Sequence, residues 1–341
     1  MLFRPAIEND LPAVMRLAER AGAGMTSLPH DEQRLLARMQ RSVDTFAGRL
    51  PAHEQGFLFV LEDPDTAQVV GVSAIEVAVG LSEPFYNFRI QRTVRASRDL
   101  GVYKNLELLT MSYDHTGHSE LCTLFLDPDY QKNRNGLLLS KARLLFIAAF
   151  RELFSAQIFA EMRGVLTDEG KSPFWDALGH HFFAMPFVDA DRMTGCGAKT
   201  FIAELMPSYP IYINLLPEDA RAVIGQVHAR TAPARSILEK EGFRWTGSVD
   251  IFDAGPVLEA ETDRIRAIKE SYQVAANADL RFPGVPTLVS NTQFNQFRAM
   301  LLLPNAQGVI PSLDNIQMDA LQIAENDPVR LVALNPEEST A

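Results

Sequence analysis

The spacing of apolar residues divides the first part of the chain into strands and helices. Apolar runs of strand length predict three strands, over residues 2–4, 56–62 and 69–78. Apolar residues at helical spacing predict two helices, which begin near Leu11 and Asp31. An Asp-Pro-Asp turn separates the second strand from the third, so we expect these two strands to form an antiparallel hairpin.

A strand, a turn and a helix form the central unit of the chain. Residues 120–126 are an apolar run that ends at a polar turn, as expected of a buried strand. Helical spacing begins near residue 135, with one face toward a core and with Lys141 and Arg143 expected to face water. A second apolar strand follows over residues 157–162. This order of elements predicts an α/β fold, in which helices flank a mixed sheet.

The remaining pattern is built from shorter elements. It predicts helices over residues 172–183, 217–223 and 231–241 and strands over residues 200–205 and 249–252. Ser172 and Pro173 are suited to the cap and first turn of the first of these helices. The tail is rich in Pro, Gly and polar residues between short apolar runs, so we expect a small β-rich C-terminal lobe. We divide the chain into a core (1–205), a companion segment (206–270) and this lobe (271–341).

Composition and charge narrow the classes of function. Of the 341 residues 47% are hydrophobic, the formal net charge is −11 and no Lys/Arg-rich run occurs. These features argue against a nucleic-acid or anionic-membrane partner and are compatible with a small cationic substrate. Two cysteines and no zinc-ligand spacing indicate neither a disulfide framework nor a metal site. The first twenty residues carry charges throughout and no long apolar run occurs, so we expect a cytoplasmic protein.

The turn before the central helix is a candidate anion site. Residues 131–136 can present backbone N–H groups at the positive end of that helix, where a pyrophosphate would bind. Lys132 and Arg134 would add positive charge there. A single glycine before a helix is also typical of an ordinary cap, and the residues alone leave both readings open.

The same turn resembles the acyl-CoA-binding motif of the GNAT acyltransferase superfamily. Gln131 and Gly136 stand at the first and last positions of the motif Gln/Arg-x-x-Gly-x-Gly/Ala. Arg134 replaces the first glycine of the motif. The turn must therefore either avoid a positive φ at Arg134 or hold a non-glycine residue in a less favoured conformation.

Segments along nearly the whole chain resemble the arginine N-succinyltransferase family. They include Thr26-Ser27-Leu28-Pro29, Asp114-His115-Thr116-Gly117, Ser119-Glu120-Leu121-Cys122, Ala160-Glu161-Met162-Arg163-Gly164, Ser172-Pro173-Phe174-Trp175, Ile224-Gly225-Gln226-Val227-His228 and Asp250-Ile251-Phe252-Asp253. The resemblance implies a GNAT-like, acyl-CoA-binding core in which the acyl donor enters between strands 120–126 and 157–162. It implies transfer of a succinyl group from succinyl-CoA to the α-amine of L-arginine, the first step of an arginine catabolic route. No permanently bound cofactor is implied.

The resemblance also assigns roles to single residues. It places the proton donor of the family at His228 and a succinyl-CoA-binding residue at Leu124, alongside Gln131 and Gly136 of the turn. Leu124 has no reactive group, so it would act through its backbone or its apolar surface. From the residues alone, His228 can carry or release a proton near neutral pH, but a capping or core histidine is favoured over a catalytic one.

Other candidate side chains keep two interpretations. His115 and His118 flank a glycine beside a strand and favour a loop role over acid–base chemistry. Cys122 is better explained as a buried, inert thiol than as a nucleophile. Three carboxylates suit a guanidinium and suit ordinary ion pairs equally well: Asp114, Glu120 and Glu161.

Three alternatives to this function remain at the level of the sequence. The substrate can be ornithine in place of arginine, since nothing in the sequence measures the length of the cationic side chain. Because Arg134 replaces a motif glycine, the chain can instead be a weakly active, acyl-CoA-binding module or one subunit of a hetero-oligomer. A homo-oligomer is equally open. The broadest alternative is a GNAT-type transferase for another acyl group.

Overall fold

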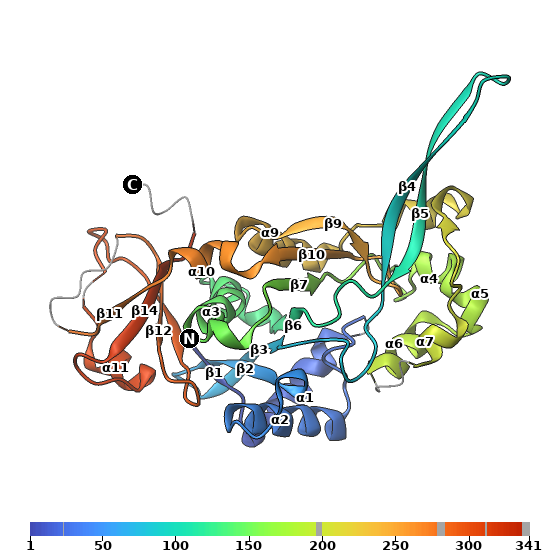
Figure 1. Ribbon diagram of the computed structural model, residues 1–341. Coiled ribbons are helices and arrows are strands. Elements are labelled where there is room, and N and C mark those ends of the chain that lie inside the picture. Colours follow the sequence, from blue (N-terminus) through green and yellow to red (C-terminus); the bar gives the residue numbers. More distant parts are fainter. Residues whose placement is uncertain (23, 196–199, 278–283, 311, 336–341) are drawn as a thin grey trace.

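The computed structural model describes residues 1–22, 24–195, 200–277, 284–310 and 312–335 (Figure 1). The strands of these residues form one sheet of fourteen strands. In chain order they are β1 (Leu2–Pro5), β2 (Gly56–Asp63), β3 (Gln68–Glu76), β4 (Asn87–Ser97), β5 (Val102–Ser112), β6 (Ser119–Leu126), β7 (Gln157–Glu161), β8 (Ile211–Tyr212), β9 (Arg244–Val249), β10 (Pro256–Glu261), β11 (Tyr272–Ala275), β12 (Thr287–Asn291), β13 (Ala299–Leu302) and β14 (Pro328–Ala333).

Helices cover both faces of this sheet. They are α1 (Leu11–Ala21), α2 (Glu32–Phe46), α3 (Asn135–Ala149), α4 (Pro173–Ala177), α5 (Gly179–Phe183), α6 (Phe187–Gly195), α7 (Thr200–Leu205), α8 (Glu218–Val223), α9 (Ala232–Lys240), α10 (Arg266–Glu270) and α11 (Asn315–Leu321). Among the described residues, none of these helices is long and apolar enough to cross a membrane.

The strand order is β11-β14-β12-β13-β1-β2-β3-β6-β7-β10-β9-β4-β5-β8. All described neighbours are antiparallel except β6 and β7, which are parallel. Two parallel strands need a long crossover connection, and here α3 supplies it. The predicted strand–helix–strand unit and the predicted β2–β3 hairpin are therefore confirmed.

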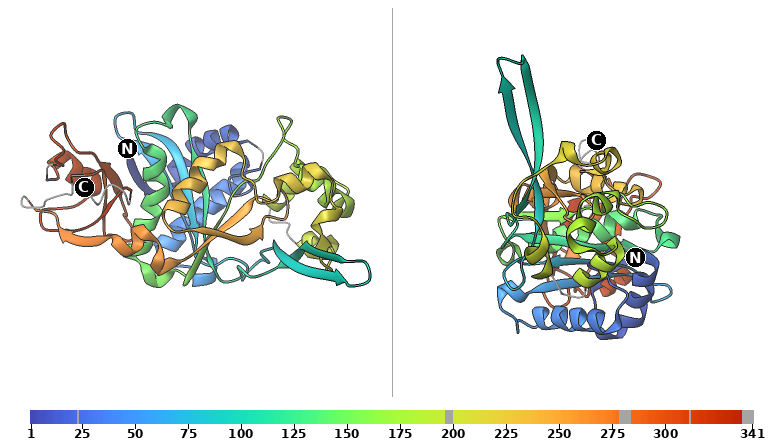
Figure 2. Two further views of the ribbon diagram at one scale, coloured as in Figure 1. Left: turned by 90° about the horizontal axis from the view of Figure 1, so that it is seen from above. Right: turned by 90° about the vertical axis from the view of Figure 1, so that its right-hand side faces the viewer.

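Two apolar layers hold the middle of the sheet. On one face, α1 and α2 pack on β2 and β3 through residues such as Leu17, Leu35 and Val60. On the other face, α3 packs through an aromatic cluster in which the rings of Phe59 and Phe146 lie 5.1 Å apart. Figures 1 and 2 show the sheet between these helices. Burial of each large apolar side chain stabilises this sandwich by about 1.5–3 kcal/mol.

Side-chain caps fix several predicted helix starts. The Asp31 carboxylate accepts a hydrogen bond from the backbone N–H of Arg34 at the start of α2. The Ser172 hydroxyl accepts one from Trp175 at the start of α4. The predicted helix over 172–183 is nevertheless two helices, α4 and α5. The helix breaks at Leu178, and the next residue is Gly179, where a Cβ would lie 2.3 Å from the Trp175 ring.

The expectation that Lys141 and Arg143 face water is wrong. Both side chains are buried, because α3 is enclosed by the sheet on one side and by α9, α10 and the C-terminal strand on the other. The Lys141 ammonium lies 2.8 Å from the carboxylate of Glu241 and also bonds to the carbonyl oxygen of Leu334. The Arg143 guanidinium donates to the carbonyl oxygen of Cys122 at 3.3 Å. Buried polar partners thus replace the expected solvent.

Two predicted strands are also wrong. Residues 200–205 form the helix α7, in which Ile202 packs into the cluster beneath α4–α8 together with Met206 just beyond it. The strand expected at 249–252 lies earlier in the chain, because β9 spans Arg244–Val249 and ends at the first of these residues. The Asp250 carboxylate accepts hydrogen bonds from the N–H groups of Phe252 and Asp253, which closes a turn at this point.

The C-terminal residues form four strands and continue the main sheet. β13 pairs with β1 through Phe3 and Ala299. On its other side β13 pairs with β12, which pairs with β14. The β-rich character expected after residue 271 is therefore present, as an extension of the sheet. The limits of the three expected domains remain a prediction.

Candidate active site

A bulge in β6 opens the gap at the centre of the sheet. Ser73 of β3 faces two residues of β6, Thr123 and Leu124, because the register shifts between the flanking pairs. Thr123 has a φ of 54°, in the left-handed region. The bulge reverses the alternation of side chains, so that Leu124 packs toward α3 whereas Cys122 packs toward α1 and α2. Leu124, the predicted succinyl-CoA-binding residue, therefore lies in the bulge of β6.

The parallel strands β6 and β7 separate near this bulge. Their described ladder holds two residue pairs, Ser119 with Ile158 and Glu120 with Phe159. Beyond these pairs β7 remains paired along its length with β10. The carboxyl ends of β6 and β7 thus diverge, which is the geometry expected of strands that admit an acyl-CoA between them.

The turn between β6 and α3 has the left-handed conformation that its sequence left open. Arg134 has φ 63° and ψ 17°, and the preceding Asn133 has φ 51°. The side-chain amide of Gln131 donates to the carbonyl oxygen of Leu126 at 3.2 Å and fixes the start of the turn. A Cβ on Gly136 would meet only an ordinary contact at 3.8 Å. Packing within the protein therefore does not require glycine at position 136.

This turn borders a hollow of about 570 Å³. The hollow is lined by Lys132 and Asn133 of the turn and by Asp63, Asp65 and Asp129, together with apolar residues. Gln131, Gly136 and Leu124 are not among its lining residues. The predicted phosphate turn is thus adjacent to a mixed-charge surface.

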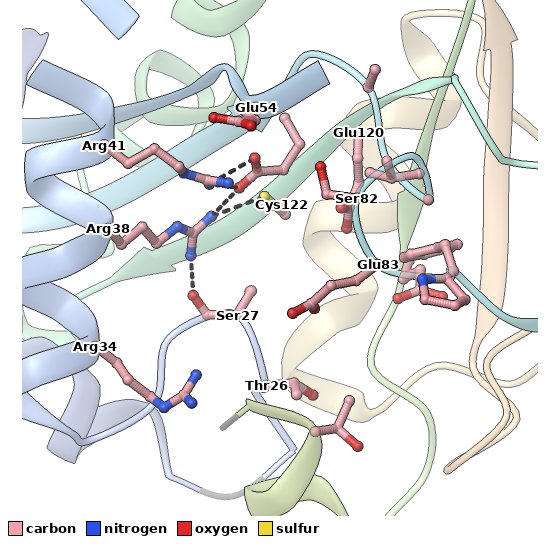
Figure 3. A pocket seen from close by; sticks show the side chains of 18 of the residues that line it. Thr26, Ser27, Arg34, Arg38, Arg41, Glu54, Ser82, Glu83, Glu120 and Cys122 are labelled. Atoms are coloured by element: carbon pink, nitrogen blue, oxygen red, sulfur yellow. Dashed lines mark hydrogen bonds and ion pairs between the residues drawn. The ribbon is translucent and has the colours of Figure 1, made fainter. Parts of the chain in front are cut away.

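A larger cavity of about 840 Å³ lies on the α2 side of the sheet (Figure 3). One wall carries Arg34, Arg38 and Arg41, which follow one another by four and three residues and so share a face of α2. The Arg38 guanidinium donates to the Glu76 carboxylate at 3.0 Å and to the Cys122 sulfur at 3.3 Å. Arg41 also reaches Glu76, and Arg34 points into the cavity. This wall is a row of positive charge.

A second set of carboxylates lines the cavity and begins beside Glu76, whose strand partner is Glu120. Glu120 of β6, Glu161 at the end of β7 and Asp250 after β9 all line it. Burial raises the pKa of Glu161 well above its ordinary value, and the negative charges of Asp250 and Glu120 add to the effect. Burial likewise raises the pKa of Asp250. The Glu161 carboxylate accepts one hydrogen bond from Asn87 at 2.7 Å. This part of the cavity is suited to a cationic ligand.

His228 lies beyond the end of β7, in the turn that leads to α9. Its backbone N–H donates to the carbonyl oxygen of Arg163 at 2.9 Å. Its Nδ1 accepts a hydrogen bond from the N–H of Arg230 at 3.1 Å and caps the 3₁₀ turn Ala229–Thr231. A ring nitrogen that accepts is unprotonated, so the neutral imidazole carries its proton on Nε2. Burial lowers the pKa of His228, and the nearby Arg163 and Arg230 lower it further. His228 does not line the cavity beside α2.

The remaining candidates have structural partners. His115 is buried, with Nδ1 2.6 Å from Asn87 Oδ1 and Nε2 3.3 Å from the Glu259 carboxylate. Burial raises the pKa of Cys122 to about 12, with Glu120 as a second cause, so its thiol stays protonated. Within the described ranges, no group of His, Cys, Asp and Glu side chains is arranged to hold a metal ion.

The arginine row of the cavity and the carboxylate of Asp250 were not identified from the sequence. The row of Arg34, Arg38 and Arg41 has a regular spacing, but a polar helix face more often meets solvent. Glu120 and Glu161 were candidates whose placement the fold supplies, since Asp250 comes to them from a turn far along the chain. Asp114 is not among the cavity residues.

Known proteins match this chain along nearly its whole length. The family described as "Arginine N-succinyltransferase beta subunit" matches residues 1–267. A protein named arginine N-succinyltransferase from Photorhabdus laumondii subsp. laumondii is 58% identical, over 99% of this chain and 100% of the relative. A relative of the same name from an Enterobacter species is 53% identical, over 100% of both chains.

The chain belongs to the arginine N-succinyltransferase family.

A solved structure within this similarity is the arginine/ornithine succinyltransferase subunit AI from Pseudomonas aeruginosa. It is 38% identical to this chain, covers 98% of each chain and superposes with a TM-score of 0.88. The predicted α/β fold class and the predicted arginine N-succinyltransferase family are both confirmed. The roles of His228, Leu124, Gln131 and Gly136 remain predictions, which the geometry described above makes specific.

Proposed function

We propose that this chain transfers a succinyl group from succinyl-CoA to the α-amine of L-arginine and releases N2-succinyl-L-arginine and CoA. The observation that supports this most is the cavity beside α2, which is lined both by arginines and by carboxylates. Free arginine carries the complementary groups, a guanidinium and a carboxylate. Family membership supports the same reaction.

The guanidinium of arginine would bind at the acidic part of the cavity. Glu120, Glu161 and Asp250 lie there, and burial together with repulsion by Asp250 and Glu120 raises the pKa of Glu161. A planar guanidinium donates several hydrogen bonds and would neutralise this repulsion. Arg34 and Arg38 on α2 would then hold a substrate carboxylate. This arrangement would leave the α-amine between the carboxylates and the arginines of the cavity.

The acyl donor would enter between β6 and β7. Its pyrophosphate would lie at the turn of residues 131–136, where Gln131 fixes the backbone and Gly136 leaves room beside the helix start. The thioester would then reach the bulge at Leu124. Backbone N–H groups at such a site can stabilise the oxyanion of the transition state, an effect of about 10²–10³ in rate for other enzymes.

The transfer itself needs one bond formed and one broken. The neutral α-amine attacks the thioester carbon, the C–S bond breaks and its electron pair leaves with sulfur. The amine loses one proton and the sulfur gains one. An α-amine with a pKa near ~8 is roughly 10% neutral at pH 7, so positioning contributes more than strong basicity. His228 would donate to the departing sulfur as the imidazolium, from Nε2, and would return to the neutral form whose Nδ1 accepts the N–H of Arg230.

Release of free CoA by the purified chain tests this function. We expect rapid release from succinyl-CoA when arginine is present, with N2-succinyl-arginine found by mass spectrometry. Acetyl-CoA and other short acyl donors should react at least tenfold more slowly. An arginine-independent release, or a faster reaction with another acyl donor, would contradict the proposal.

Ornithine is a second candidate acceptor, because the Pseudomonas aeruginosa relative is described as an arginine/ornithine succinyltransferase subunit. Its shorter side chain ends in an ammonium group and can make fewer hydrogen bonds to three carboxylates. We therefore expect kcat/KM to be higher for arginine. The ratio of the two values, measured at one succinyl-CoA concentration, distinguishes the candidates.

A further inference from the structure

The hairpin of β4 and β5 extends away from the body of the molecule (Figures 1 and 2). Its strands pair in unbroken register from Asn87 opposite Ser112 to Ser97 opposite Val102. At the base of the hairpin, β4 also pairs with β9 and β5 also pairs with β8. The pair of β4 and β9 nearest the tip is Arg89 with Ser248. Beyond this base the described strands pair only with each other. We call the distal residues 90–106 the arm.

The arm has the chemistry of a surface that is covered in an assembly. A two-stranded ribbon alone is marginally stable in water and gains stability from a third partner. Large apolar side chains are nevertheless exposed near its tip, with exposed fractions of 53% for Val94, 77% for Leu100 and 71% for Tyr103. Long, exposed strand edges are also ready sites for pairing with another chain.

The charges of the arm indicate the sign of its partner. Arg95 lies directly opposite Lys104, and two like charges in that position destabilise a ribbon. The Arg92–Glu107 ion pair, at 3.3 Å, lies nearer the base and does not screen them. Four cations and one carboxylate give the arm a formal charge of +3. The whole chain has a formal charge of −11, so the rest of the chain carries −14. An acidic partner would relieve the repulsion on the arm.

We propose that the arm docks on a second copy of this chain. Two arms would repel each other, so each arm must contact the acidic body of its partner copy, which has the complementary charge. The body offers acidic side chains near apolar ones, for instance the exposed Glu218 and Asp219 close in the chain to the exposed Leu215. Two reciprocal contacts of this kind make a closed, symmetric dimer. The inference does not depend on the proposed function.

Sedimentation velocity of the full chain over about 1–100 μM tests the proposal. The wild type should sediment as an assembly of at least twice the 37.9 kDa of one chain, and added salt should weaken it. The variant Arg95→Glu/Lys104→Glu should raise the dissociation constant by about tenfold or more. The control Lys240→Glu/Lys269→Glu makes the same change in charge at exposed positions on α9 and α10 and should leave it unchanged.

A shortened arm gives an independent test that does not depend on charge. Replacing residues 94–105 with Asn-Gly joins Thr93 to Leu106, which already face each other, through a two-residue turn. This variant should keep the near-UV circular dichroism of the wild type and should sediment as a single chain. A wild type that is monomeric throughout this range, or a shortened variant that assembles as tightly as the wild type, overturns the proposal.

Discussion

Two ionisable side chains at the site have pKa values that the surrounding fold has moved toward their neutral forms. Burial and two neighbouring carboxylates raise the pKa of Glu161, and burial and two arginines lower that of His228. Because of these shifts, a bound ligand can change the protonation state of each side chain. A bound guanidinium would restore the charge of Glu161, and the departing sulfur would meet the Nε2 proton of His228.

Substitution of His228 separates its two tasks. We expect His228→Ala to lower kcat by about 10²–10⁴ and to leave KM for succinyl-CoA within about twofold, as for loss of one proton donor. His228→Asn can still cap the turn through its side-chain oxygen, so it should keep the thermal stability of the wild type but share the loss of kcat. A near-normal kcat of His228→Asn would show that His228 is only a structural cap.

The lowered pKa of His228 also predicts a pH effect. The imidazolium, which is the stronger proton donor, becomes more abundant as pH falls toward this pKa. The ratio of wild-type kcat to that of His228→Asn should therefore rise as pH is lowered from about 8 to 6. A constant ratio would show that no ionisation of His228 contributes to the rate.

The raised pKa of Glu161 predicts how stability depends on pH. In the unfolded chain this carboxyl ionises near ~4.3, whereas in the fold it ionises at higher pH. Between those two values the folded state holds a proton that the unfolded state has released, so the free energy of unfolding decreases as pH rises. Thermal unfolding at several pH values should show this slope for the wild type without substrate. Glu161→Gln should flatten it, and an unchanged slope would contradict the assignment.

At the level of helices and strands, the sequence predicts what depends on local periodicity. The strands of the central unit, α2 and α3 all follow from apolar spacing. Spacing does not reveal what covers the polar face of a helix, which is why the buried Lys141 and Arg143 were expected in water. The same limit applies to the cavity, because Glu161 and Asp250 meet through contacts between distant segments.

The turn before α3 yields a prediction about the acyl donor. Gly136→Val should weaken the binding of succinyl-CoA by about tenfold or more, since a branched side chain would cover the N–H groups of the helix start. The fold has space for a Cβ there, so stability should change little. Gly136→Ala is the matched control and should have the smaller effect. Calorimetric titrations of both variants with CoA and with arginine measure the two affinities. If Gly136→Val weakened the binding of arginine as much as that of CoA, the turn would not be the phosphate site.

At the level of the whole molecule, one sheet and one buried ionic cluster join the C-terminal strands to the core. The Glu241 carboxylate lies 2.8 Å from both the Lys141 ammonium and the Arg266 guanidinium, and all three side chains are buried. Lys141 and Arg266 also bond to the carbonyl oxygen of Leu334, just beyond β14. Three segments that are distant in sequence thus share one set of charges.

This cluster predicts a large effect of a small substitution. Glu241→Gln removes the counter-charge of the buried Lys141 and leaves Arg266 paired with the more exposed Glu270, which we expect to reduce the free energy of unfolding by about 3–5 kcal/mol. Glu239→Gln, on the exposed side of α9, is the control and should change it by less than about 0.5 kcal/mol. Denaturant titration measures both variants. A Glu241→Gln protein as stable as the control would show that the cluster contributes little.

The central claim is that arginine binds in the cavity beside α2 while succinyl-CoA binds between β6 and β7. The most direct test is the steady-state rate of CoA release by Glu161→Gln, with each substrate varied in turn. Glutamine keeps the shape of the side chain and the bond from Asn87, so only the charge is lost. We predict an increase in KM for arginine equivalent to about 2–5 kcal/mol, with KM for succinyl-CoA within about twofold. An equal rise in both values, or an unchanged KM for arginine, would contradict the account.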